Sequence, residues 1–433
     1  MDPAIITLCV LAVAAFLFVT ELIPLAVTAM AACTMLGILG VLPAKQVYAG
    51  LSNSTVVLFG GMFVIGAAMF KTGLAEAIGI AVVKKAGTGE IRLMGAIMLV
   101  TIILSSVSSN TGTVACLMPV IVGICQAAKI PASKELMPLA IAANVGGTIT
   151  MIGTPPNVIV TGALSAAGLP TFGFFEFAYI GIPLSAIIFF WTLFVGRHFL
   201  PDKSAGAMDE EAVKAAKEEA GAGDDNAPKS KTKMWISGLI LIGVVLAMAL
   251  ELPTLPLQTA AVTGAILCVI TGCLKEKEAY AGIDWVTIFL FAGMMPVATA
   301  LDQSGAGKMI ADAVIGVMGS DPSPYFATAV LFALSCIMTQ FMSNTASCAL
   351  LAPIGISIAQ GMGADPHAVL MAIGVAASCA FGTPVGTPPN TLVLGPGQYK
   401  FTDYVKAGVP LILVCFVVSL IIIPMVWPFF PGK

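Results

Sequence analysis

The sequence SSVSSNTGTV at residues 105–114 is matched by TQFMSNTASC at residues 339–348, so the tripeptide Ser-Asn-Thr occurs twice. Further along the chain, each copy is followed by the pentapeptide GTPPN, at 153–157 and at 386–390. The two motifs keep their order at offsets of 234 and 233 residues. Because self-similarity at a nearly fixed offset indicates an internal repeat, we expect two structurally equivalent halves.

Shorter matches extend this repeat toward the start of each half. Tyr-Ala-Gly at 48–50 recurs at 280–282, and Phe-Gly-Gly-Met at 59–62 recurs as Phe-Ala-Gly-Met at 291–294. One tripeptide could match by chance, but four matches in the same order indicate a duplication.

The composition is that of a protein dissolved in a lipid bilayer. Of the 433 residues, 58% are hydrophobic and only 10% are charged. Runs such as 236–250 and 411–427 contain no charged residue, which is typical of membrane-spanning helices. The net charge of −3 gives no indication of a nucleic-acid partner. We therefore predict an all-α, multi-pass protein of the inner (plasma) membrane.

Each half is predicted to contain about five membrane crossings and one re-entrant hairpin. Because five is odd, the two halves should be inverted repeats, with broken helices at the membrane midplane. The hairpins, 92–128 and 324–361, are too long for one crossing and are interrupted by Ser-Asn-Thr. The predicted crossings are 3–20, 24–42, 52–70, 134–168 and 176–198, then 235–252, 256–274, 284–301, 367–394 and 405–428.

A polar linker at 201–233, with eight acidic residues and six lysines, separates the halves. We expect it to be a solvated cytoplasmic spacer in which residues 208–220 form a surface helix. The predicted parts are a first repeat at 1–200, with scaffold helices in 1–70 and a transport part at 90–198, and a second repeat at 234–433, with scaffold helices at 235–301 and a transport part at 324–428.

The placement of positive charge predicts the orientation. If both termini are outside, 17 of the 20 lysines and arginines fall on the cytoplasmic side, including all six in the linker. Only Lys45, Lys308 and Lys433 then lie outside. The opposite orientation would violate the positive-inside rule.

The two motifs are uncharged but rich in hydrogen-bonding groups, at a depth where unsatisfied polar groups are costly. Proline at 155, 156, 388 and 389 blocks helix continuation, so the chain should unwind near Gly153 and Gly386. Unwound carbonyls are ligands for cations, and half-helix N-termini attract anions.

The Ser-Asn-Thr tips add side chains of both polarities. Asn110 and Asn344 each offer an oxygen to a cation and an NH2 group to an anion. Ser105 and Thr339 place a hydroxyl on the same helical face, one turn earlier. Alternatively, Ser-Asn-Thr could only cap the second arm of each hairpin. Asn157 and Asn390 could either contact a ligand or cap the helix that resumes after Pro-Pro.

With the doubled Ser-Asn-Thr motif and the two Thr-Pro breaks, the chain resembles the divalent anion/sodium symporters, which include bacterial succinate-type dicarboxylate transporters. The resemblance covers nearly the whole chain. It implies one sodium site at Ser105, Ser109, Asn110 and Gly153, and a second at Thr339, Met342, Asn344 and Gly386. The implied substrate ligands are Ser109, Asn110, Thr111, Thr154, Pro155, Ser343, Asn344, Thr345, Thr387 and Pro388. A homodimer and an elevator-type mechanism are also implied.

We therefore expect a secondary transporter, not an enzyme, that carries a small dianion with sodium and needs no other cofactor. Two similar half-sites suit an anionic group at each end, as in a C4-dicarboxylate such as succinate. The alternatives are sodium/sulfate or sodium/citrate symport, or sodium-independent dicarboxylate exchange. A channel is disfavoured because the broken repeats place a binding site at the midplane. An intramembrane enzyme is disfavoured because Ser, Asn and Thr alone provide no base and no metal set.

Overall fold

The computed structural model describes residues 2–87, 89–220, 230–250, 254–318 and 323–431, and all the regular secondary structure in these ranges is helical. The first half comprises α1 (Pro3–Thr20), α2 (Leu25–Ile38), α3 (Ala44–Val47), η1 (Ala49–Ser52), α4 (Ser54–Lys71), α5 (Leu74–Ala86), α6 (Glu90–Ser105), α7 (Asn110–Ala128), α8 (Ser133–Gly146), α9 (Pro155–Ala166), α10 (Ala178–Phe194) and η2 (Gly196–Phe199). The linker contains α11 (Glu210–Glu219). The second half comprises α12 (Lys231–Ala249), α13 (Leu257–Ile270), α14 (Glu276–Ala281), α15 (Trp285–Ser304), α16 (Ala306–Met318), α17 (Pro324–Met338), α18 (Asn344–Gly361), α19 (Pro366–Ser378), α20 (Pro388–Leu394) and α21 (Phe401–Val426).

The all-helical fold class is confirmed, and each predicted crossing or hairpin coincides with a helix or a helix pair. Six described helices are long and apolar enough to span a membrane: α1, α4, α7, α12, α15 and α21. Two predicted crossings are broken helices, because α8 and α9 are separated by 147–154, and α19 and α20 by 379–387.

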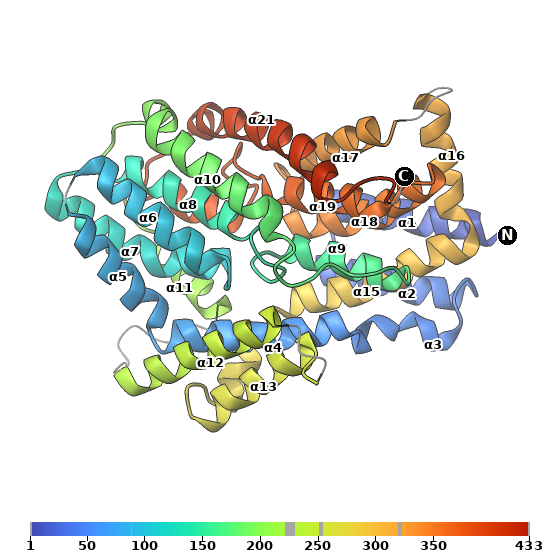
Figure 1. Ribbon diagram of the computed structural model, residues 1–433, viewed down its shortest axis with the longest axis horizontal. Helices are drawn as coiled ribbons and strands as arrows, with labels where there is room; N and C mark the ends of the chain where they lie inside the picture. The colour runs from blue at the N-terminus through green and yellow to red at the C-terminus, as the bar shows by residue number, and fades with distance from the viewer. Residues whose placement is uncertain (1, 88, 221–229, 251–253, 319–322, 432–433) are drawn as a thin grey trace.

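Reciprocal packing joins the two halves. In Figure 1 the blue α4 lies beside the yellow α13, and the blue α2 lies beside the yellow α15. A Cβ placed on Gly61 of α4 would lie 2.7 Å from the Ala261 backbone of α13, and one on Gly293 of α15 would lie 2.7 Å from the Ala29 backbone of α2. These motif glycines therefore let each helix pair pack closely. Such reciprocity is expected of halves related by an approximate two-fold axis, and their inversion across the bilayer stays a prediction.

Two helices that the hydropathy pattern did not predict connect the scaffold helices to the hairpins. α5 lies between α4 and α6 in the chain, and α16 lies between α15 and α17. α5 packs against both α6 and α7, and α16 packs against α18. Each hairpin therefore has a connecting helix along one side.

Residues 201–220 of the linker pack more closely against the rest of the molecule than a solvated spacer would. Its helix α11 forms within the predicted 208–220, but Val213, Ala216 and Ala220 are buried against the rest of the molecule. The ion pair on its exposed face joins Lys214 and Glu218, 3.9 Å apart. The predicted helix is present and has an exposed face, but its apolar face packs against α7, which a solvated spacer would not do.

Candidate functional site

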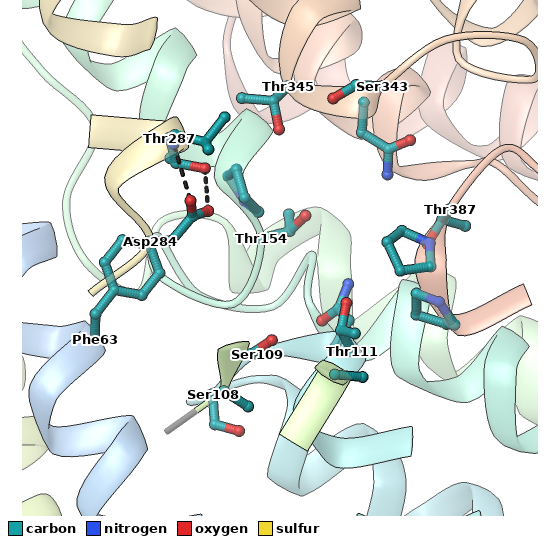
Figure 2. Close-up of a pocket in the computed structure, with 18 of the residues that line it drawn as sticks. Phe63, Ser108, Ser109, Thr111, Thr154, Asp284, Thr287, Ser343, Thr345 and Thr387 are labelled. Carbon is teal, nitrogen blue, oxygen red and sulfur yellow. Dashed lines mark hydrogen bonds between the residues drawn. The ribbon is translucent and has the colours of Figure 1, made fainter. Parts of the chain in front are cut away.

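The two hairpin tips and the two helix breaks meet in one cavity of about 830 Å³. Figure 2 shows Ser109 and Thr111 from the first tip opposite Ser343 and Thr345 from the second, with Thr154 and Thr387 between them. All ten predicted substrate ligands line this cavity. We call the first-repeat residues half-site one (105–111, 143 and 153–155) and the second-repeat residues half-site two (339–345, 377 and 386–388).

Behind the tip of half-site one, four polar groups form a tight cluster. The amide of Asn110 lies 2.6 Å from Ser105 Oγ, and Ser105 Oγ lies 2.8 Å from the carbonyl oxygen of Ala143. The same end of the amide lies 3.1 Å from Gly153 O and 3.2 Å from Ala143 O. If the NH2 group faces this cluster, its two hydrogens can be donated among these three oxygens. If Oδ1 faces it, four oxygens share the single proton of Ser105, which is an arrangement suited to a small hard cation.

Half-site two repeats this cluster. Thr339 Oγ1 lies 2.6 Å from Asn344 Oδ1 and 2.7 Å from Ala377 O. A Cβ on Gly386 would lie 3.1 Å from Thr339 O, so the second helix break packs directly against the hairpin. One hydroxyl proton cannot serve both acceptors of Thr339, so this cluster also has surplus oxygen lone pairs.

Two of the residues that the resemblance assigned to sodium, Ser109 and Met342, make none of the hydrogen bonds described for the two clusters. Ser109 Oγ accepts a hydrogen bond from Gly112 N at 3.3 Å and so caps α7. Met342 is buried and lines the cavity. The capping interpretation therefore applies to the serine of the first motif, whereas no side-chain cap bond is made by Ser343 at the start of α18.

Asn157 and Asn390 have a role that neither sequence interpretation anticipated. Asn157 Nδ2 donates to the carbonyls of Gly147 and Thr150, at 3.2 and 2.8 Å. Asn390 Nδ2 donates to Ala380 O and Thr383 O, at 2.7 and 2.8 Å. Because both asparagines are buried and bind the loop between the two helix segments, they stabilise the broken conformation itself.

The electrostatics of the cavity come from the backbone rather than from basic side chains. None of the described lining residues is lysine or arginine. α7 and α18 begin at Asn110 and Asn344 in the cavity wall, so their positive dipole ends favour an anion there. The described acidic lining residues are Glu21 and Asp284, and Asp284 accepts hydrogen bonds from the Thr287 backbone and hydroxyl (Figure 2).

Several residues of this region carried no recognisable sequence signal. The carbonyls of Ala143 and Ala377 belong to the clusters, but a carbonyl can come from any residue. Asn144 is buried in α8 and reaches the other repeat, because its Oδ1 accepts from Thr387 Oγ1 at 3.2 Å and its Nδ2 donates to Asn390 Oδ1 at 3.3 Å. Four alanines of the linker, at 212, 215, 216 and 220, also line the cavity.

Comparison with known protein families identifies the family of this chain. A model of the citrate transporter family matches residues 15–368 and 341–431. The chain belongs to the citrate transporter family. The transporter is therefore a multi-pass membrane protein and not an enzyme, and the cavity is its candidate translocation site.

Alignments with curated relatives cover nearly the full chain. An uncharacterised transporter of Haemophilus influenzae is 30% identical, with 97% of this chain and 91% of the relative aligned. The transporter YfbS of Escherichia coli, also uncharacterised, is 26% identical over 98% of this chain and 99% of its own length. A sodium-dependent dicarboxylate transporter, SdcS of Staphylococcus saprophyticus, is 25% identical over 95% of this chain and 84% of its own length.

Solved structures support the same fold. The YdaH transporter of Alcanivorax borkumensis superposes with a TM-score of 0.65 at 13% identity, and the match covers 100% of both chains. MtrF of Neisseria gonorrhoeae superposes with a TM-score of 0.63 at 15% identity, over 92% of this chain and 86% of MtrF. At these identities the likeness establishes the fold alone.

Proposed function

We propose that this protein is a sodium-coupled symporter of a small dianion, with a C4-dicarboxylate such as succinate as its substrate. The observation that carries the proposal is the pair of oxygen clusters, one behind each Ser-Asn-Thr tip. In both, the asparagine of the motif reaches the cluster and also lines the substrate cavity. Sodium and substrate would therefore share two residues, Asn110 and Asn344.

The geometry of the amide supplies a coupling mechanism. When sodium occupies a cluster, Oδ1 of the asparagine faces the ion and its NH2 group is presented to the cavity, where it donates to a carboxylate. Without sodium, the NH2 group of Asn110 is satisfied by Ser105, Ala143 and Gly153. Its oxygen then faces the cavity and repels a carboxylate. Sodium binding would in this way create the anion site.

A dianion suits the symmetry of the cavity. Each half-site offers an asparagine, hydroxyl groups and a helix N-terminus, which are donors for one carboxylate. Because no described lysine or arginine lines the cavity, co-bound sodium ions would supply the neutralising charge. The SdcS relative is named a sodium-dependent dicarboxylate transporter, which is consistent with this assignment.

The proposed movement is of elevator type. The hairpins and broken helices (α6–α10 and α17–α21) would carry the site past the scaffold helices (α1–α4 and α12–α15).

The proposed assembly is a homodimer, as the resemblance implies. In the proposed orientation, both termini lie outside and the linker lies in the cytoplasm. A cysteine in place of Ser230 should then react with an impermeant reagent only from the cytoplasmic side, and labelling in intact cells would refute this orientation.

Uptake into proteoliposomes tests the function. We expect radiolabelled succinate to accumulate when sodium is present on the substrate side, and replacement of sodium by potassium to reduce uptake to near background. If more than two sodium ions accompany each dianion, an inside-negative potential should increase uptake, since each net charge is worth about 2.3 kcal/mol per 100 mV. Equal uptake in potassium would identify an exchanger, and preferential uptake of citrate or sulfate would change the substrate.

A further inference from the structure

The linker helix α11 forms part of the wall of the proposed substrate cavity. Ala212, Ala215, Ala216 and Ala220 line it together with the first Ser-Asn-Thr tip. In Figure 2 a short green helical segment lies directly beside Ser109 and Thr111. The opposite face of α11 carries the exposed Lys214–Glu218 pair. The helix is therefore amphipathic, with its small residues toward the site.

A difference between the two repeats occurs where α11 packs. The residue after the first Ser-Asn-Thr is Gly112, and the residue after the second is Ala346. A Cβ on Gly112 would overlap the Cβ of Ala220 and would lie 2.8 Å from the ring of Phe70. Ala346 is fully buried within α18, so the α-helix itself tolerates alanine at this position. The glycine makes room for the linker.

The segment that precedes α11 is attached to the hairpin-bearing part. Lys203 N donates to Ser133 Oγ of α8 at 2.9 Å, and Lys203 Nζ donates to Gln398 O at 2.6 Å. Gly206 N donates to Pro396 O at 2.8 Å, and Gln398 Nε2 donates to Ser204 O at 3.1 Å. Residues 201–206 therefore bridge the transport parts of both repeats, and they hold α11 at the cavity.

We propose that α11 is a lid that belongs to the substrate site: it closes the cavity on the linker side and must undock when substrate passes on that side. Because its cavity face is alanine, it also limits the size of substrate that the closed cavity can hold. The inference rests on the proposed function for its substrate, but the docking of α11 can be tested without any substrate.

The first experiment measures access to the cavity. Val107 lines the cavity and is partly exposed, so Val107→Cys serves as a reporter in a protein whose exposed Cys9 is replaced by serine. An impermeant thiol reagent is added to vesicles on the linker side. Replacement of residues 208–220 by a Gly/Ser sequence of equal length should accelerate labelling about tenfold, which corresponds to about 1.4 kcal/mol of docking free energy. The parent protein without Val107→Cys gives the background.

Point variants separate undocking from a change in linker length. Ala216→Leu and Ala220→Leu enlarge the buried face and should accelerate labelling as the replacement does. Lys214→Leu, on the exposed face, should leave the rate within twofold of the parent. If labelling is equally fast in all of these proteins, α11 is no lid and the inference is overturned.

A transport assay then tests the size limit. Ala215→Leu should reduce uptake of the largest transported anion more than uptake of the smallest, while Lys214→Leu should reduce neither. A uniform effect on all anions would overturn the size limit. If no anion is transported with sodium while the labelling results hold, the lid stands and the proposed function fails.

Discussion

In half-site one, Ser105 Oγ lies 2.6 Å from the Asn110 amide and 2.8 Å from Ala143 O; in half-site two, Thr339 Oγ1 lies 2.6 and 2.7 Å from the equivalent atoms of Asn344 and Ala377. The hydroxyl oxygen, the asparagine amide and the alanine carbonyl are therefore arranged at nearly the same distances in both half-sites. The surroundings of the two clusters differ more than the clusters themselves.

The divergence is largest in how each hairpin is fixed to its helix break. The carbonyl of Gln340 accepts from Thr383 Oγ1, as the carbonyl of Ser106 accepts from Thr150 Oγ1, so this bond is shared by both half-sites. The difference is in the side chain: Gln340 Nε2 donates to Cys336 O and Cys379 O, and its Oε1 accepts from Gly382 N at 2.9 Å. The equivalent residue in half-site one is Ser106, whose Oγ bonds only within its own turn, to Ile103 O. In half-site one, fewer side-chain hydrogen bonds therefore join the hairpin to its helix break. Half-site one is also the one that α11 covers.

The largest expected effect removes what the half-sites share. Asn110→Ala and Asn344→Ala each delete a proposed cation ligand and a proposed anion donor. Because a hydrogen bond to a charged group contributes about 1.5–3 kcal/mol, each variant should lose one to two decades of affinity for substrate, and transport should fall close to background. Sodium and substrate binding to the purified variants provides the measurement. Normal binding and transport by both folded variants would mean that the tips are helix caps only.

Aspartate at the same positions sharpens this prediction. Asn110→Asp and Asn344→Asp keep oxygen toward the cluster but present a second oxygen, rather than NH2, to the cavity. Sodium binding without substrate should persist, while substrate binding should be lost as completely as in the alanine variants. Retained substrate affinity would contradict the proposed coupling through the amide.

The next effect concerns the brace of half-site two. Gln340→Leu leaves the buried Gly382 N–H without an acceptor, which should cost about 1–3 kcal/mol. We expect a lower thermal midpoint in detergent, whereas the matched Ser106→Ala should change the midpoint little. If both variants melt alike, the bonds of Gln340 do not make half-site two the firmer one.

A smaller effect should distinguish the proposed sodium ligands from the proposed substrate ligands within each half-site. Ser105→Ala and Thr339→Val remove a hydroxyl that lies behind the tip, away from the cavity lining, so they should raise the sodium concentration required about tenfold and affect intrinsic substrate affinity less. Thr111→Val and Thr345→Val, which change the cavity wall, should do the reverse. Titration of sodium at fixed substrate, and of substrate at saturating sodium, separates the two. Equal shifts in both titrations for all four variants would refute the division of roles.

Sequence reasoning located most of this architecture because the signals were local. Uncharged runs fixed the long helices to within a few residues, and Pro-Pro after Gly-Thr marked both breaks, since proline cannot continue a helix. It missed α5 and α16, which are short and carry charged residues. It could not find the carbonyls of Ala143 and Ala377, which no side chain marks. The docking of α11 was missed because an Ala-rich charged helix is equally compatible with solvent.

The smallest expected effect tests the link between the half-sites. Asn144 of the first repeat bonds Thr387 and Asn390 of the second, but its counterpart Ser378 donates only within its own helix, to Gly374 O. Asn157 Oδ1, the counterpart of Asn390 Oδ1, is buried without a hydrogen-bond partner. The asymmetry therefore leaves Thr387 held by the opposite repeat.

Asn144→Ala removes that support, and each lost bond is worth about 0.5–1.5 kcal/mol. Because Thr387 is a proposed substrate ligand, substrate affinity at saturating sodium should fall about fivefold, while Ser378→Ala should change it less than twofold. A double-mutant cycle decides whether Asn144 acts through Thr387. If it does, Asn144→Ala combined with Thr387→Val should bind substrate no more weakly than Thr387→Val alone. Additive losses would show that Asn144 acts by another route, and the half-sites would then be functionally independent despite the bonds that join them.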